Sequence, residues 1–351
     1  MTEAEARAAF AAFPGQLRLG RFLGGGSMGV VFAAESAGRP LAVKVVLNVF
    51  GCLEDLRRLL RELRALTAVA TVAHPNIVGF VGAAAEANTL IFVYDRCDAS
   101  LGQHLRHPRH RASDRRSLDP DIIRYLMYQM LSALDYLHRR NLVHCDVKPE
   151  NTLVMRNCHL RLTDFGLTHA APVAPELLQT DWYRAPEVID GSRPFGAPID
   201  MWSAGCVFAE LLRAGRAEYA ALFPHSGDNL RDGTNALADA IMELIGGGGA
   251  RLRELFDFAR PAAHLLCQML SLDPTERPTA AEALAHPYFE GAAAFAAAHL
   301  AGGAAAVTAP TTAVDMSDID GLPATEPALR AKLVELLATA RWPTEAPIKS
   351  E

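Results

Sequence analysis

Residues 144–151 read H-C-D-V-K-P-E-N, and D-F-G follows at residues 164–166. This short part of the chain brings together Asp146, Lys148, Asn151 and Asp164. Asp146 could orient an attacking hydroxyl and Lys148 could steady a transferring phosphate, while the asparagine and the second acid offer the oxygens that Mg²⁺ prefers. The spacing therefore predicts a phosphoryl-transfer site that uses a metal and a nucleotide.

The composition narrows the class of protein. The chain has 351 residues, half of them apolar, which gives room for about two domains with a sizeable core. Its net charge of −6 argues against a general nucleic-acid binder. The six cysteines (residues 52, 97, 145, 158, 206 and 267) form neither a C-x-x-C pair nor a metal-binding spacing, which indicates a reducing compartment.

Membrane and targeting segments are not expected. The closest candidate for a membrane-spanning stretch, residues 291–309, is mostly alanine and is interrupted by His299 and two glycines. The N-terminus carries Glu3 and Glu5, where a signal or transit peptide would be basic or poor in acids. The expected protein is therefore soluble and intracellular, in the cytoplasm or nucleus, with neither a membrane nor a nucleic acid as partner.

The pattern along the chain predicts two parts of different character. Strands are predicted at residues 17–23, 30–34, 41–46 and 89–94, a leucine-striped helix at 53–67, and further helices at 122–138, 199–212 and 236–245. A small strand-rich part followed by a larger helical part predicts an α+β fold of two lobes, with the motifs at a cleft between them.

The end of the chain differs in composition. Residues 290–309 are rich in alanine and residues 308–327 in Thr, Pro and Asp, which is typical of a linker. Residues 327–342 then predict a short helix with leucines on one side. The expected division is an N-terminal extension at 1–16, one domain at 17–290 with lobes at 17–96 and 97–290, and a linker with a short helix at 291–351.

A glycine motif, G-x-G-x-x-G-x-V, occupies residues 24–31. Such a motif is often only a turn, and a Rossmann dinucleotide loop has the same letters. A Rossmann loop opens a helix, however, whereas residues 30–34 continue as strand and a strand carrying Lys44 follows. Glycines let backbone amides approach phosphates, and a lysine that ends an apolar run needs an anion. The motif therefore favours a nucleotide phosphate loop.

Three more motifs follow in order: T-D-W-Y-R-A-P-E at 180–187, D-M-W-S-A-G at 200–205 and H-P-Y-F at 286–289. With them, residues 17–289 resemble a eukaryotic protein kinase of the serine/threonine type. The W-Y-R run and residues 199–211 are most similar to the cyclin-dependent and MAP kinase branch. The resemblance implies the two-lobed protein kinase fold and transfer of the γ-phosphate of ATP, with Mg²⁺, to Ser or Thr of a protein substrate.

The resemblance also implies roles for single residues. Asp146 is the catalytic base with Lys148 beside it, and Asn151 and Asp164 hold Mg²⁺. Nucleotide contacts are implied for Leu23, Gly24, Gly26, Gly29, Val31, Ala42, Lys44, Glu62, Asp95, Cys97 and Leu153, with Tyr94 at the gatekeeper position.

Two ion pairs are expected. Glu62 should hold Lys44, with a solvated surface charge as the alternative role for Glu62 and Glu54 as a second candidate partner. Glu187 should pair with Arg277, whereas the second A-P-E, at residues 174–176, is a decoy because it lacks the W-Y-R lead-in.

The chain departs from the family at an activation switch. Cys145 replaces the arginine of H-R-D, which in the similar branch joins two others in binding a phosphorylated activation loop. Of those partners Arg61 is kept and His169 stands in place of the other, while the loop at 167–179 offers only Thr168 as a hydroxyl. We therefore expect activity without an activation-loop phosphate. The alternative is that Cys145 only fills space and a regulatory protein sets activity.

Other features leave alternatives open. The insert that the similar branch carries between residues 245 and 262 is absent, so its docking surfaces are not carried over. The arginine-rich residues 106–116 are a solvated loop or a dock for an acidic partner, and the tail helix packs on the kinase body or binds another protein. The main alternative to an active enzyme is a pseudokinase that acts as a nucleotide-binding scaffold. A third, a small-molecule kinase, would lack the A-P-E motif and the late arginine.

Overall fold

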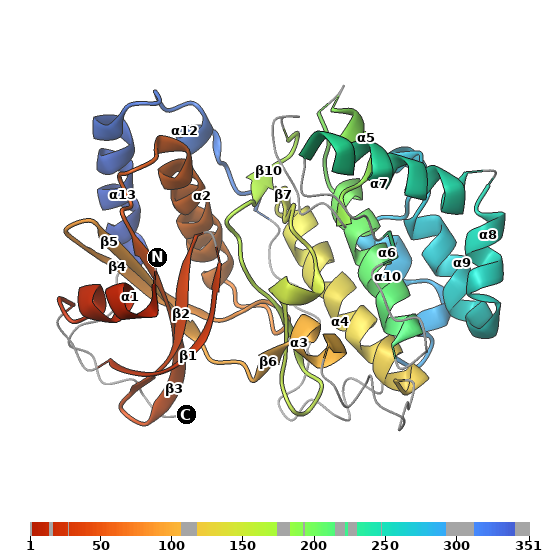
Figure 1. The fold of residues 1–351 in the computed structure, drawn as a ribbon, viewed down its shortest axis with the longest axis horizontal. Coiled ribbons are helices and arrows are strands. Elements are labelled where there is room, and N and C mark those ends of the chain that lie inside the picture. Colours follow the sequence, from red (N-terminus) through yellow and green to blue (C-terminus); the bar gives the residue numbers. More distant parts are fainter. Residues whose placement is uncertain are drawn as a thin grey trace. The chain divides into compact units, whose positions relative to one another are not determined.

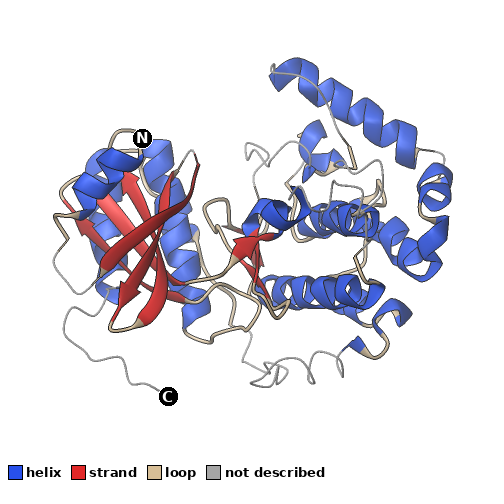
Figure 2. Cartoon of the chain, turned by 60° about the horizontal axis from the view of Figure 1, so that its bottom comes forward, coloured by secondary structure: helices blue, strands red, loops and turns tan. Residues whose placement is uncertain are grey.

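The computed structural model describes residues 2–13, 17–26, 28–106, 118–173, 183–191, 194–214, 222–223, 230–246, 248–292 and 312–340, without the side chains of 230–237 and 258 (Figure 1). It divides into two compact units. Unit 1 comprises Met1–Ala73, Val78–Cys97 and Asp315–Glu351, and unit 2 comprises His74–Ile77 and Asp98–Val314. Strands dominate the first unit and helices the second (Figure 2), which confirms the predicted α+β class.

Unit 1 is built on a five-stranded antiparallel sheet in the order β1-β2-β3-β5-β4. The strands are β1 (Arg18–Gly26), β2 (Gly29–Ser36), β3 (Arg39–Leu47), β4 (Phe80–Glu86) and β5 (Thr89–Asp95). Side chains alternate between the two faces of each strand. One face buries Phe32 and Val43 together with Ala6 and Phe10 of helix α1 (Glu3–Phe10), whereas the other carries Lys44.

Helix α2 (Leu53–Ala70) packs in unit 1 through a leucine stripe. Leu56, Leu59, Leu60, Leu63 and Leu66 are all buried. Two tail helices, α12 (Ser317–Asp320) and α13 (Glu326–Ala340), lie against α2, and α13 also contacts β4. Of the predicted tail helix, residues 341 and 342 fall outside the described residues.

Unit 2 is mainly helical. Its helices are α3 (Leu101–Arg106), α4 (Pro120–Arg139), α5 (Pro186–Asp190), α6 (Pro198–Arg213), α7 (Leu230–Ile245), α8 (Ala250–Leu255), α9 (Arg260–Met269) and α10 (Ala280–Leu284). Short 3₁₀ turns are η2 (Pro149–Asn151), η4 (Asp257–Ala259), η5 (Pro274–Glu276) and η6 (Pro287–Phe289). The central helix α6 is buried along almost its whole length, including Trp202.

Short strands in unit 2 position the loops that carry the motifs. Strands β6 (Ala99–Ser100), β8 (Thr152–Val154) and β9 (Leu160–Leu162) form a small sheet in the order β6-β8-β9, and β7 (Leu142–Val143) pairs with β10 (His169–Ala170). The H-C-D loop follows β7, and D-F-G follows β9. Among the described helices, none combines the length and the apolar character needed to cross a bilayer.

Candidate active site

A buried acid anchors the loop that follows β7. Asp200, in the first turn of α6, is fully buried and accepts hydrogen bonds from the backbone N–H groups of His144 (2.8 Å) and Cys145 (2.9 Å). Its Oδ2 also lies 2.9 Å from Nε2 of His138. Cys145 has a φ of 65°, a left-handed conformation that costs a non-glycine residue about 1 kcal/mol. The contacts with Asp200 hold this strained turn in place.

Two donors fix the carboxylate of Asp146, which is buried. Its Oδ2 accepts from Nζ of Lys148 and from Nδ2 of Asn151, each at 2.7 Å. The same Nδ2 lies 2.9 Å from the backbone oxygen of Asp146, so the asparagine donates to both the side chain and the backbone of that residue. The structure thus brings Asp146, Lys148 and Asn151 together, as the motif predicts.

His144 connects this loop to the D-F-G segment. Its Nδ1 accepts the N–H of Asp146 at 3.3 Å, so Nε2 carries the proton donated to the carbonyl of Thr163 at 3.1 Å. The N–H of Thr163 donates to the carbonyl of Asn151 at 3.0 Å. Thr163, the residue before Asp164, is therefore bonded to the catalytic loop through both its N–H and its carbonyl.

The donor set in unit 2 suits a hard cation. The amide nitrogen of Asn151 faces Asp146, so its Oδ1 is the atom offered to a ligand, and Asp164 supplies a carboxylate from a left-handed turn (φ 62°). Amide and carboxylate oxygens are typical Mg²⁺ ligands. These residues therefore fit the Mg²⁺ that the family implies.

The predicted lysine–glutamate pair is present in unit 1. Nζ of Lys44, on β3, lies 2.8 Å from both carboxylate oxygens of Glu62 on α2, and the side chain of Glu62 is only 1% exposed. The alternative role of Glu62 as a solvated surface charge is thus wrong. A contact that the sequence did not predict completes the group, because the hydroxyl of Tyr94 donates to Oε1 of Glu62 at 3.1 Å.

The glycine motif forms the end of the β1–β2 hairpin. A side chain at Gly29 would bring its Cβ to 2.8 Å from the carbonyl oxygen of Val45, so packing alone requires glycine there. A Cβ at Gly24 or Gly26 would meet nothing within 4 Å. These two glycines leave open space beside the backbone, which fits a loop that admits phosphate groups.

The other predicted nucleotide contacts are partly exposed apolar positions or hinge residues. Leu23, Val31 and Ala42 are half-buried on β1, β2 and β3, and Leu153 is half-buried on β8 in unit 2. In the hinge, the carboxylate of Asp95 accepts a hydrogen bond from Arg39 at 2.6 Å. The backbone N–H of Asp95 donates to the carbonyl of Gly79 at 2.8 Å. Cys97 is half-buried and is the last residue of the Val78–Cys97 segment of unit 1.

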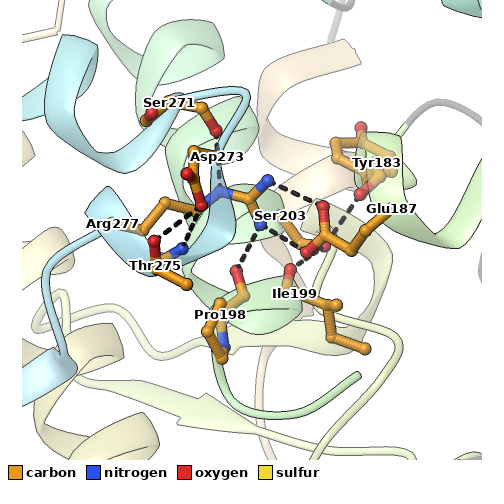
Figure 3. Close-up of polar contacts among 9 residues, drawn as sticks. All are labelled: Tyr183, Glu187, Pro198, Ile199, Ser203, Ser271, Asp273, Thr275 and Arg277. Atoms are coloured by element: carbon orange, nitrogen blue, oxygen red, sulfur yellow. Dashed lines mark hydrogen bonds and ion pairs between the residues drawn. The ribbon is translucent and has the colours of Figure 1, made fainter. Parts of the chain in front are cut away.

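The A-P-E glutamate forms the predicted pair with the late arginine (Figure 3). Glu187 accepts two hydrogen bonds from the buried guanidinium of Arg277, at 2.6 and 2.7 Å. The same guanidinium donates to the carbonyls of Ser271 and Pro198 and lies over the ring of Trp202. Planar bidentate pairs of this kind are strong and geometrically specific.

Tyr183 is anchored beside this pair. Its hydroxyl donates to Glu210 at 2.6 Å. Its carbonyl accepts from Oγ of Ser203 at 2.8 Å, as Figure 3 shows. Residues 180–182 of the same motif, and the decoy at 174–176, lie outside the described residues.

Three residues that the sequence links to the activation switch lie within the described part of the chain. Cys145 is fully buried, and its Sγ donates to the carbonyl of Val143 at 3.4 Å. Nδ1 of His169 donates to the carbonyl of Leu167. Thr168 is fully buried, and its hydroxyl has no hydrogen-bond partner among the described residues.

The basic run is mostly outside the described residues, which end at 106 and resume at 118. Arg106 forms an ion pair with Glu150 of the η2 turn.

At the other end of the chain, Asp320 accepts a hydrogen bond from Nε of Arg61 at 2.8 Å. No sequence pattern predicted this contact.

Comparison with known proteins gives one consistent result. A family model described as the protein kinase domain matches residues 17–289. The chain is 34% identical to mitogen-activated protein kinase 7 of Arabidopsis thaliana and 33% identical to mitogen-activated protein kinase 14 of the same plant, over 77% of this chain and 77% and 78% of theirs.

A longer relative gives the same identity. The chain is 34% identical to mitogen-activated protein kinase 8 of Oryza sativa subsp. japonica, and the match covers 77% of this chain but only 51% of that protein. The chain thus spans about half the length of some of the relatives it matches. It belongs to the protein kinase family, among the serine/threonine kinases and close to the MAP kinase branch.

Proposed function

We propose that this chain is an active kinase that transfers the γ-phosphate of ATP to serine or threonine hydroxyls of protein substrates. The observation that carries the proposal is the carboxylate of Asp146, fixed by Lys148 and Asn151 on a loop that Asp200 anchors. Phosphoryl transfer depends on positioning and charge neutralisation rather than on covalent chemistry. A rigidly held carboxylate is what that chemistry asks of the protein.

Each residue of the site has a role in this proposal. Asp146 orients the acceptor hydroxyl and takes its proton, while Lys148 neutralises charge next to it. Lys44, held by Glu62, binds the phosphates of the nucleotide. Asn151 and Asp164 would hold Mg²⁺, whose positive charge would offset the negative charge that develops on the phosphate oxygens.

The test is transfer of labelled γ-phosphate from Mg-ATP to a degenerate Ser/Thr peptide array by the wild type and by Asp146→Asn. Asp257→Asn serves as the control, because Asp257 makes an exposed pair with Arg260 in the same unit. Transfer by the wild type and the control, but not by Asp146→Asn, supports the proposal. Nucleotide binding without any transfer by the wild type supports either the scaffold alternative or a kinase that awaits a regulatory protein.

The second part of the proposal is that no activation-loop phosphate is needed. Cys145 and His169 offer no guanidinium for a phosphate, and Thr168 is buried. Arg61 already has a carboxylate partner in Asp320. A regulatory protein remains a proposed partner only if the unassisted chain proves inactive.

A further inference from the structure

Helix α2 presents a row of arginines to the tail of the chain. Arg57, Arg61 and Arg64 stand at i, i+4 and i+7, so they share one face of the helix. Arg57 donates to the carbonyl of Leu322 at 2.8 Å, and Nε of Arg61 donates to the carboxylate of Asp320 at 2.8 Å. All three meet the same short segment, because Arg64 lies 3.6 Å from a carboxylate oxygen of Asp318.

The tail segment that supplies these partners is itself held firmly. Met316, just before the segment, and Ile319, within it, are both fully buried. Lys332, on α13, pairs with Asp318 at 2.7 Å. The same helix buries Leu329, Leu333 and Leu336, and it packs on α2 and β4. The contact with Arg61 is therefore made by an ordered element and not by a loose surface side chain.

Arg61 is a good point from which to position the helix. Its side chain is 11% exposed, so its charge depends on a partner. Glu54 lies farther away, at 3.9 Å, and is 59% exposed, which makes Asp320 the stronger partner. The next residue, Glu62, points to Lys44. Because a helix moves as a rigid body, whatever fixes Arg61 also fixes the carboxylate that holds Lys44.

We infer that Asp320 is a positioning residue for phosphate transfer. Its carboxylate holds Arg61, and through it α2, in the place where Glu62 meets Lys44. The acid that pairs with Arg61 is thus part of the chain itself, so this arginine requires no phosphate. The inference rests on the proposed function and deepens it, because it names what keeps the lysine–glutamate pair formed.

The first experiment compares Asp320→Asn with Asp320→Glu and with Glu326→Gln. Glu326 makes an exposed pair with Arg330 in the same tail, so its variant controls for loss of any tail charge. We expect Asp320→Asn to lose about three- to tenfold in kcat/KM for ATP, the effect of one charge-assisted hydrogen bond. Asp320→Glu should recover much of this loss, and Glu326→Gln should resemble the wild type.

A second readout separates positioning from simple stability. If Asp320 acts through Glu62, adding Asp320→Asn to a Glu62→Gln variant should cause no further loss in kcat/KM, at a temperature well below both melting points. Amide hydrogen exchange in residues 53–70 should also rise in Asp320→Asn and not in Glu326→Gln. Independent, additive losses, or unchanged kcat/KM with only a lower melting temperature, would overturn the inference.

The outcome for the proposed function stays distinct. If the wild type transfers phosphate and Asp320→Asn equals Glu326→Gln, the inference fails while the function stands. If the wild type transfers no phosphate, the function fails and hydrogen exchange alone decides. Faster exchange in 53–70 for Asp320→Asn then supports the tail contact as the element that holds α2, and unchanged exchange overturns it.

Discussion

Among single residues, Tyr94 has a role that its position in the sequence does not reveal. Its hydroxyl donates to the carboxylate of Glu62. Its ring stacks with the ring of Phe92, and the two ring centroids lie 6.3 Å apart. Tyr94→Phe keeps the ring and removes only the donor. We expect roughly a two- to tenfold fall in kcat/KM for ATP, because a buried carboxylate loses one hydrogen bond.

Steady-state kinetics with varied ATP would measure this effect. Tyr128→Phe is the matched control, since Tyr128 lies edge-on to Phe289 and has no assigned part in the site. Equal kcat/KM for Tyr94→Phe and Tyr128→Phe would show that the hydroxyl of Tyr94 does not position Glu62.

A second residue, His74, should make stability depend on pH. Burial, with His159 nearby, lowers the pKa of His74 from 6.5 to about 4. The unfolded chain therefore takes up this proton near pH 6.5 and the folded chain only near pH 4, so between these values the unfolded state binds more protons. The free energy of unfolding should fall as the pH drops through this window, by up to about 3 kcal/mol.

Urea unfolding between pH 4 and 7.5 would measure this slope. His74→Asn can still accept the N–H of Asn76 that Nδ1 now accepts at 3.2 Å, but it does not titrate. Its slope should be clearly smaller than that of the wild type. An identical slope in the two proteins would exclude His74 as the source.

At the scale of elements, α13 offers a direct comparison between its two faces. Leu333 is 3% exposed and faces the helix packing, whereas the adjacent Val334 is 70% exposed. Leu333→Ala should lower the free energy of unfolding of unit 1 by about 2–5 kcal/mol because it leaves a cavity. Val334→Ala should change it by less than about 0.5 kcal/mol.

Chemical denaturation followed by hydrogen exchange in residues 53–70 and 326–340 would assign the loss to unit 1. The site-specific readout is needed because two units need not unfold in one step. Similar effects of the two substitutions would mean that α13 does not pack on α2 in solution.

For the whole molecule, local patterns predicted most of the elements. The helix predicted at 53–67 is α2, which ends three residues later. Those predicted at 122–138 and 199–212 are α4 and α6, with ends that differ by one or two residues, because their apolar stripes are long and regular. Helix α7 begins six residues before the predicted start at 236. Helix α1 was not predicted, although Thr2 and Glu5 form a capping box that marks its start.

The contacts of the candidate site also fall into two groups, those that the sequence predicted and those that it did not. Contacts inside a motif, such as Asp146 with Asn151, and the pair of Lys44 with Glu62 followed from spacing and family resemblance. The contact of Arg61 with Asp320 joins residues 259 positions apart. Neither periodicity nor a motif records such a pairing, because it depends on how the tail folds back onto α2.

Both units bear on whether the enzyme needs an activating phosphate. In unit 1 the arginine that a phosphate would meet is paired with Asp320, and in unit 2 the only hydroxyl of the short loop, on Thr168, is buried. Treatment with a serine/threonine phosphatase should therefore leave the rate of peptide phosphorylation unchanged, with a phosphoprotein standard in the same tube to confirm that the phosphatase is active. Thr168→Val should also keep full activity, since the hydroxyl it removes has no partner among the described residues.

Mass spectrometry of the untreated protein decides what any loss would mean. A fall of more than about tenfold, equal to 1.4 kcal/mol of transition-state stabilisation, would contradict phosphate independence if the lost phosphate maps to Thr168. The buried Thr168 would then have to leave its present site before phosphorylation, and Thr168→Val would be inactive like the treated enzyme. Unchanged rates in both experiments would instead support a kinase that needs no activation-loop phosphate.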